Sequence, residues 1–181
     1  MSAFPKYDYE LLKWVQINRI DFLDVFFYWI SSSTFIVSII TLGIIGWLYI
    51  TKKPKPFNIK YYSLLLIIIA SSFISLFLKY TVKRPRPFIT NPDIIQLSET
   101  SNFSFPSGHT TIAFTLAFGM LFISFKKIYL LPVFCWAFLV AYSRMILGAH
   151  YLTDILTAII ISFMLSLLIK PISTKWTVKK T

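Results

Sequence analysis

The chain has 181 residues, of which 56% are hydrophobic and only 14% are charged, and its formal net charge is +11. An average soluble domain carries about 25% charged residues, so this composition excludes an ordinary soluble protein and indicates one that lies in a lipid bilayer. The only cysteine, Cys135, excludes a disulfide framework or a multi-cysteine metal site within one chain.

Residues 1–33 combine aromatic side chains with charges, a mixture that is costly to insert into lipid but suits the membrane interface. We expect an amphipathic helix that lies on the membrane surface. The alternative is a longer first span that begins near Phe22. The first apolar stretch also begins too far along the chain, and lacks the basic leader, of a removable secretory signal, so we expect no cleavage.

Five apolar stretches without charge then approach the roughly 17 to 25 residues that a helix needs to cross hydrocarbon. They predict spanning helices over residues 34–50, 61–80, 107–125, 128–144 and 150–169. Prolines and lysines between residues 51 and 60 interrupt the apolar pattern, and Pro85 and Pro87 end the second span. We therefore predict an all-α polytopic membrane bundle. It forms one domain over residues 1–181, with 1–33 as the interfacial segment and 34–181 as the helical bundle.

The longest connection between predicted spans runs from Phe88 to Phe105 and is polar. Within it, Ile94 and Ile95 are candidates for a lid that dips into the lipid headgroups, because long loops between spans often carry function.

When the predicted spans are followed along the chain, the charged residues divide between the two sides of the membrane. Ten lysines without any acid fall on one side: Lys52, Lys53, Lys55, Lys60, Lys126, Lys127, Lys170, Lys175, Lys179 and Lys180. All seven acids fall on the other side with the remaining cations. The positive-inside rule makes the lysine-rich side cytoplasmic. This bias accounts for most of the net charge, so we expect no nucleic-acid partner.

Three polar clusters converge on the outer side by topology: residues 79–87, 106–109 and 143–154. Together they contain both histidines of the chain. Ionisable groups close to lipid are costly and are usually paired or functional, so a cluster of cations there predicts an anionic ligand such as phosphate. The candidate phosphate-binding residues are Lys79, Arg86, Ser107, Gly108 and Arg144, which offer cationic groups, a helix N-terminus and close backbone approach.

The two histidines and one carboxylate are the candidate catalytic groups. His150 and Asp154 are four residues apart, so on a helix they share a face and the carboxylate can accept a hydrogen bond from Nδ1. His150 would then attack phosphorus through Nε2 and form a phosphohistidine. His109 would protonate the leaving oxygen and later deprotonate the attacking water.

Two alternatives concern these polar residues. Two histidines and an aspartate also suggest a zinc site, but the neighbouring cations repel a divalent ion, so we expect neither a metal nor another cofactor. Lys83 and Arg84 are either headgroup contacts or part of a solvated face.

These residues resemble the tripartite signature of the type 2 phosphatidic acid phosphatase superfamily, KxxxxxxRP, PSGH and SRxxxxxHxxxD. The chain matches all three parts without substitution, over about residues 79 to 154. The resemblance implies that His150 is the nucleophile, Asp154 its orienting residue and His109 the general acid. It implies the same phosphate-binding set as above. Common membrane members have six spans, whereas this sequence predicts five.

The resemblance implies a lipid phosphatase of a bacterial plasma membrane whose active site faces the periplasm or exterior. Its candidate substrates include undecaprenyl diphosphate, phosphatidylglycerol phosphate and lipid A phosphate. The expected partners are the lipid phosphate substrate and membrane lipids, and the oligomeric state stays open. The alternatives are a lipid-to-lipid phosphotransferase and a non-catalytic phospholipid-binding or transport protein.

Overall fold

The computed structural model describes residues 6–52, 55–101, 103–122 and 126–178, and the regular structure over these ranges is entirely helical. The predicted all-α class is therefore confirmed. The elements in chain order are α1 (Lys6–Ile17), the 3-10 helix η1 (Asp21–Leu23), α2 (Asp24–Lys52), α3 (Lys55–Val82), α4 (Pro87–Thr90), α5 (Gly108–Phe122), α6 (Lys127–Ile146) and α7 (Leu152–Val178).

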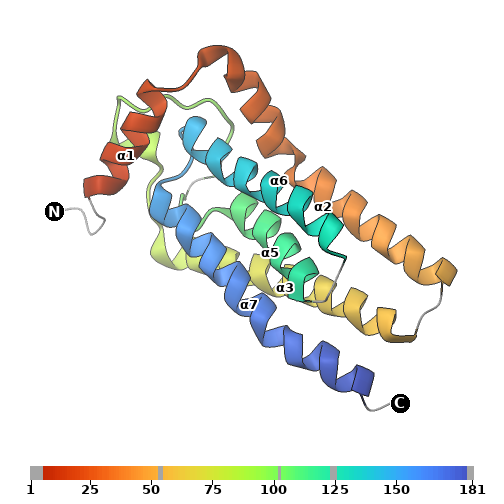
Figure 1. Ribbon diagram of the computed structural model, residues 1–181. Helices are drawn as coiled ribbons and strands as arrows, with labels where there is room; N and C mark the ends of the chain where they lie inside the picture. Colours follow the sequence, from red (N-terminus) through yellow and green to blue (C-terminus); the bar gives the residue numbers. More distant parts are fainter. Residues whose placement is uncertain (1–5, 53–54, 102, 123–125, 179–181) are drawn as a thin grey trace.

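The long helices lie side by side in one bundle, and α1 lies across one end of it, next to the beginning of α7 (Figure 1). The end of α2, the beginning of α3 and the end of α7 are at the opposite end of the bundle (Figure 1). α5 is the central helix, because it contacts α2, α3, α6 and α7.

Three stretches of the described helices are long and apolar enough to cross a membrane: Asp21–Trp47, Tyr62–Thr90 and Lys127–Ile146. Two further helical stretches, Gly108–Phe122 and Leu152–Leu168, are apolar but shorter. α5 has 15 residues and is therefore about 22 Å long, less than the roughly 30 Å of a hydrocarbon core. The predicted span over residues 128–144 lies within one of these candidates, and the spans predicted over residues 34–50 and 61–80 overlap the other two.

The first long helix starts earlier than we predicted. α2 begins at Asp24 and not at residue 34, as in the alternative with a longer first span. The charges that would make this insertion costly pair with one another, since Arg19 contacts Asp21 at 3.2 Å and Asp24 at 3.3 Å. Residues 1–33 therefore do not form one continuous interfacial segment.

Other helix boundaries also differ from the predicted ones. α3 begins at Lys55, six residues early, because Pro56 occupies the first turn, where a missing N–H costs little. α7 begins at Leu152 and continues to Val178. α5 ends at Phe122, and the predicted end at Phe125 falls outside the described residues.

Small and polar residues allow α5 to approach its neighbours closely. A Cβ at Gly119 would lie 2.5 Å from a methyl group of Leu64, so α3 and α5 can meet this closely only at a glycine. The Thr115 hydroxyl lies within hydrogen-bond distance of two serine hydroxyls, those of Ser71 of α3 at 3.0 Å and Ser162 of α7 at 3.1 Å. Such interhelical contacts between small and polar residues are typical of helices that pack in lipid.

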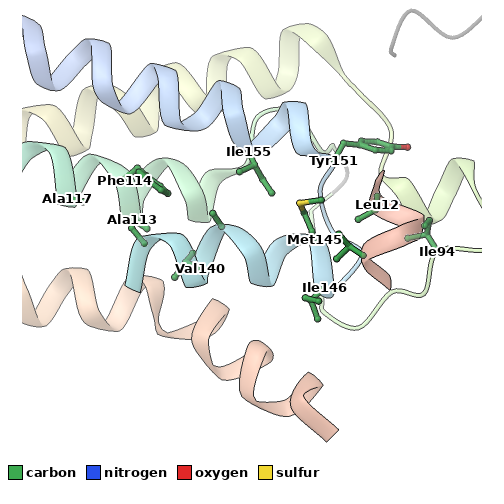
Figure 2. Packing of buried hydrophobic residues seen from close by; sticks show 13 residues of the cluster. Leu12, Ile94, Ala113, Phe114, Ala117, Val140, Met145, Ile146, Tyr151 and Ile155 are labelled. Carbon is green, nitrogen blue, oxygen red and sulfur yellow. The ribbon is translucent and has the colours of Figure 1, made fainter. Parts of the chain in front are cut away.

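The buried apolar core continues from the bundle to α1. Leu12 of α1 and Ile94 of the loop after α4 are buried beside Met145 and Ile146 at the end of α6 (Figure 2). α1 is amphipathic: it buries Leu12, Val15 and two polar side chains and exposes a face made of Tyr7, Leu11, Trp14 and Ile17.

Gly148 allows α1, the loop and α6 to meet. Its φ of +67° is in the left-handed region, and a Cβ there would lie 2.2 Å from the Ile95 carbonyl oxygen and 2.8 Å from Nε2 of Gln16. Gln16 holds the same junction, because its Nε2 donates to the carbonyl oxygens of Ile95 at 2.9 Å and Ile146 at 3.1 Å.

We expect Gly148→Ala to destabilise the protein, because the left-handed conformation alone costs about 1–2 kcal/mol for a residue with a Cβ and the junction must also open. Thermal unfolding in detergent micelles measures the loss. Gly43→Ala is the matched control, since a Cβ at Gly43 meets nothing within 4 Å and lies inside α2. An unchanged melting temperature for Gly148→Ala would contradict the close approach.

Candidate active site

The eight predicted site residues lie at the same end of the bundle and come from six parts of the chain. Lys79 is in the last turn of α3, Arg86 precedes α4, Ser107 precedes α5, which Gly108 and His109 begin, Arg144 is in the last turn of α6, His150 follows α6, and Asp154 is in the first turn of α7. The three motifs therefore come together at one end of the bundle, as the predicted topology requires.

Two changes of chain direction bring the motif residues inward. Lys83 has a positive φ of 51°, which ends α3 and starts the extended segment that carries Arg84 and Arg86. The left-handed Gly148 ends α6 in the same way. The N–H groups of Ala149 and His150 then both donate to the Arg144 carbonyl oxygen, at 3.0 and 3.2 Å. This places His150 close behind the end of α6.

His150 does not lie on a helix, contrary to our prediction, because α7 begins only at Leu152. Its Nδ1 nevertheless lies 3.4 Å from Oδ2 of Asp154. That oxygen accepts the backbone N–H of Tyr151 at 3.0 Å, and Nδ1 has no hydrogen-bond partner among the described residues. The imidazole and the carboxylate are therefore adjacent without a formed hydrogen bond, and the chain turn at residues 150–152 sets their distance instead of helical spacing.

The other ring nitrogen of His150 faces Arg86, whose NH1 lies 3.0 Å from Nε2. A guanidinium can only donate, so Nε2 accepts and carries no proton in this arrangement. The proton of the neutral ring is then on Nδ1, the nitrogen that faces Asp154. Burial, followed by the charges of Arg86 and Arg144, lowers the pKa of His150 well below its usual range, so the ring is neutral at pH 7.

Lys79 and Arg86 hold the loop that precedes α5. Nζ of Lys79 donates to the Phe103 carbonyl oxygen at 3.0 Å. Nε of Arg86 donates to the Ser101 carbonyl oxygen at 2.9 Å, and NH1 donates to the Ala149 carbonyl oxygen at 2.7 Å. In the unliganded protein these two cations are therefore partly satisfied by backbone carbonyl groups.

Arg144 is buried, with 3% of its surface exposed, and contacts α2. Its NH1 donates to the hydroxyl of Ser31. Its Nε has no hydrogen-bond partner among the described residues. A buried guanidinium nitrogen without a partner costs free energy, and an oxyanion at this point would satisfy it.

The PSGH residues form the entrance to α5. The Ser107 carbonyl accepts the Thr111 N–H at 2.9 Å, as expected of a residue that caps a helix, but its hydroxyl pairs with Thr110 and not with a backbone N–H. A Cβ at Gly108 would meet nothing within 4 Å, so the space above this backbone is open. His109 packs edge-to-face against Phe35 of α2, with ring centroids 5.3 Å apart.

Arg84 is neither a headgroup contact nor part of a solvated face, so both of our interpretations were wrong. It is buried, with 2% exposed, and forms ion pairs with Asp154 at 2.6 Å and with Asp8 of α1 at 2.8 Å. Its guanidinium also lies 3.9 Å from the centroid of the Tyr151 ring. Asp8 lies far away in the chain, so no sequence pattern predicts that it reaches this site. The position of Arg84, two residues before Arg86 of the RP motif, is the only sequence signal of its role.

The loop after α4 is docked and does not leave Ile94 free to enter lipid. Ile94 is buried, with 3% exposed, whereas Ile95 is about half exposed, so the predicted lid is wrong for Ile94. Asp93 accepts hydrogen bonds from Lys13 at 2.6 Å and from Tyr9 at 2.9 Å, and the bond from Lys13 lowers the pKa of Asp93. Residue 102 of this loop lies outside the described residues.

The charges at this end of the bundle do not balance. Three buried arginines, Arg84, Arg86 and Arg144, face two buried carboxylates, Asp8 and Asp154. The half-buried Lys79 adds a further positive charge. These groups therefore carry an excess of two positive charges. No group of three or more His, Cys, Asp or Glu side chains suited to a metal ion occurs in the described part of the chain.

Comparison with known proteins identifies the family. Residues 60–177 match the model of the PAP2 superfamily. The chain is 27% identical to an undecaprenyl-diphosphatase of Sulfolobus acidocaldarius, over 96% of this chain and 82% of that protein. It is 33% identical to a lipid A 4'-phosphatase of Porphyromonas gingivalis, over 76% of this chain and 60% of that protein.

The fold leads to the same family. The transmembrane PAP2-type phosphatidylglycerolphosphate phosphatase of Bacillus subtilis superposes with a TM-score of 0.78 at 25% identity, over 97% of this chain and 88% of that structure. Family model, relatives and fold agree with the polar cluster at the end of the bundle: the chain belongs to the PAP2 superfamily, as a membrane lipid phosphatase.

Proposed function

We propose that the chain hydrolyses the phosphate monoester or diphosphate of a membrane lipid through a phosphohistidine at His150. The observation that carries this proposal is the excess of two positive charges around a buried, neutral imidazole. A phosphoryl group brings about two negative charges, so its binding would balance a cluster that is otherwise costly to bury.

The phosphate-binding roles follow from two kinds of hydrogen-bond donor: those without a protein partner and those that could exchange their present partner for a phosphate oxygen. Nε of Arg144 is buried without a partner, and the open space at Gly108 lets a phosphate oxygen approach the N-terminus of α5. Lys79 and Arg86 would exchange their loop carbonyl partners for phosphate oxygens. Ser107 orders the first turn of α5 at the same place.

Binding would also prepare the nucleophile. When the phosphate oxygens take the donors of Arg86, the lone pair on Nε2 of His150 is released toward phosphorus. The Nδ1 proton then lies next to Asp154, whose negative charge stabilises the positive charge that develops on the ring during attack.

The reaction has two steps. A bond forms between Nε2 of His150 and phosphorus while the bond from phosphorus to the lipid oxygen breaks, and His109 gives its proton to that oxygen. Water then attacks the phosphohistidine and loses a proton to His109, which releases inorganic phosphate and restores His150. His109 is in the first turn of α5, directly after Gly108 with its open backbone, which supports its role as the proton-transfer group.

The similarity to proteins named for undecaprenyl diphosphate, lipid A and phosphatidylglycerolphosphate supports a lipid-anchored phosphate as the substrate class. These substrates share a phosphoryl group at the membrane surface and differ in the lipid. The residues proposed to bind phosphate would contact only the phosphoryl group that these substrates share, which supports phosphate release from a lipid without selecting one.

We also propose five spans, formed by α2, α3, α5, α6 and α7, with α1 in the interface through its apolar face. Lys52 ends α2 and Lys55 begins α3, and these helix ends lie at the end of the bundle opposite the site (Figure 1). Lys126 and Lys127 lie at the beginning of α6, Lys60 lies five residues after the beginning of α3, and Lys170 and Lys175 lie in the last part of α7. Lys53, Lys179 and Lys180 lie outside the described residues. The positive-inside rule then turns the site toward the periplasm or exterior of a bacterial plasma membrane.

We expect His150→Ala to reduce phosphate release by about 10³-fold or more, because the covalent route disappears. Undecaprenyl diphosphate, phosphatidylglycerolphosphate, lipid A and phosphatidic acid, each in micelles, are the substrates, and mass spectrometry of the lipid products separates hydrolysis from transfer to a second lipid. Undiminished turnover by a folded His150→Ala variant on every substrate that the wild type hydrolyses would exclude the proposed nucleophile.

Gly108→Ala is expected to fold normally, since its Cβ meets no protein atom within 4 Å, but to obstruct the phosphate. Competitive inhibition by inorganic phosphate should weaken by about tenfold, equivalent to about 1.4 kcal/mol. Gly43→Ala, which also adds a Cβ in open space but inside α2, should leave the inhibition constant unchanged. Equal inhibition constants for both variants would argue against phosphate binding at Gly108.

The lowered pKa of His150 predicts that its ring stays neutral as the pH falls through 6.5, where a free histidine becomes protonated. The chain has two histidines, so NMR spectra of histidine-labelled protein contain two ring signals, and His150→Asn assigns them. We expect the His150 signal to keep its neutral-form shift at pH values at which a free histidine is protonated. A titration midpoint near 6.5 would mean that the ring is not buried among cations.

A further inference from the structure

Arg84 and Asp8 form a buried chain of charges behind the proposed catalytic pair. Asp8 and Asp154 are both buried, with 4% and 0% exposed, and Arg84 lies between them with 2% exposed. NH1 of Arg84 donates to Oδ1 of Asp154 at 2.6 Å, and NH2 donates to Oδ2 of Asp8 at 2.8 Å. One guanidinium therefore bridges two carboxylates that come from the first and the last helix of the chain.

Asp8 also holds the first turn of α7 directly. Its Oδ1 accepts the Thr153 N–H at 3.0 Å, and its Oδ2 accepts the Thr153 hydroxyl. A carboxylate at a helix N-terminus satisfies a backbone donor that the helix itself leaves unpaired and interacts favourably with the helix dipole. The carboxylate that does so here lies 145 residues away, in α1.

The orientation of the Asp154 carboxylate depends on these contacts. Oδ1 is held by Arg84, so Oδ2 faces Nδ1 of His150 at 3.4 Å and the Tyr151 N–H at 3.0 Å. Without the bridge, Asp154 would be a buried carboxylate without its cationic partner, and such a group rotates or takes up a proton. Either change removes the negative charge from its place beside His150.

Arg84 does not face the phosphate site as Arg86 and Arg144 do. Its NH1 donates to Thr153 as well as to Asp154, its NH2 is occupied by Asp8, and its guanidinium plane lies over the Tyr151 ring. Loss of this bridge should therefore change the rate of phosphoryl transfer and leave phosphate affinity almost unaltered.

We infer that Arg84 and Asp8 are positioning residues for the Asp154–His150 pair, and that α1 thereby completes the catalytic centre. This inference rests on the proposed function of His150 and adds a residue of the N-terminal helix to the site. The arginine acts through Asp154, and the aspartate acts through Arg84 and through the start of α7.

The test is Asp8→Asn in the full-length protein, because the amide oxygen can still accept the Thr153 N–H while the charge that holds Arg84 is removed. We expect kcat on the best lipid substrate to fall by about tenfold, whereas KM and the inhibition constant of inorganic phosphate stay within about twofold. Arg84→Gln should lower kcat further, and Arg84→Lys should restore part of it because one ammonium group can still pair with Asp154.

Asp93→Asn is the matched control. Asp93 also receives contacts from α1, through Lys13 and Tyr9, but its side chain is about half exposed and remote from the Asp154 carboxylate contacts described above. If α1 only docks onto the bundle, Asp8→Asn and Asp93→Asn should have similar activities. If α1 positions Asp154, only Asp8→Asn should lose kcat.

The outcomes separate this inference from the proposed function. A wild-type kcat for Asp8→Asn, or a loss matched by equally weakened inhibition by phosphate, overturns the positioning role. If either outcome occurs while His150→Ala is inactive, the proposed function stands and only the positioning role of Asp8 and Arg84 is overturned. Activity that survives His150→Ala contradicts the proposed function itself. Should Arg84→Gln fail to fold, the comparison of Asp8→Asn with Asp93→Asn still decides between docking and positioning.

Discussion

The structure depends on the pairing of one buried carboxylate. Asp154 is fully enclosed, and a charged group in such a place is tolerated only when each oxygen has a partner. Arg84 supplies one partner, and the chain turn before α7 supplies the other through the Tyr151 N–H. Because the partners come from different helices, pairing Asp154 requires that the beginning of α7, the segment after α3 and α1 come together at one end of the bundle.

At this end of the bundle, one arginine is fully paired with carboxylates and two others are only partly paired. Arg84 has a carboxylate on each side, whereas Arg144 retains a buried Nε without a partner among the described residues and Arg86 donates to backbone carbonyl groups and to His150. The first arrangement is stable by itself. The second carries positive charge that an anion can balance, so a set of paired charges lies next to a set that is not balanced.

α1 connects two environments. Its buried face reaches the catalytic end through Asp8 and the apolar core through Leu12, and its other face exposes apolar side chains such as Trp14. Gln16 and Gly148 add a tight junction with the loop after α4. The position of α1 is coupled to the first turn of α7, because Asp8, which docks α1, also holds Thr153 and Arg84.

The sequence by itself determined the helical class, the three long apolar helices and the convergence of the three motifs, because hydrophobic length and helix direction are local properties. It also paired His150 with Asp154, although through helical spacing that does not exist at residue 150. Only the tertiary structure decided that Arg84 is buried, that Asp8 reaches it, that Ile94 belongs to the core and that α2 begins at Asp24. These outcomes depend on which side chains come into contact when the helices pack. Asp8 and Thr153 are 145 positions apart in the chain, and no periodic sequence pattern predicts a contact over that separation.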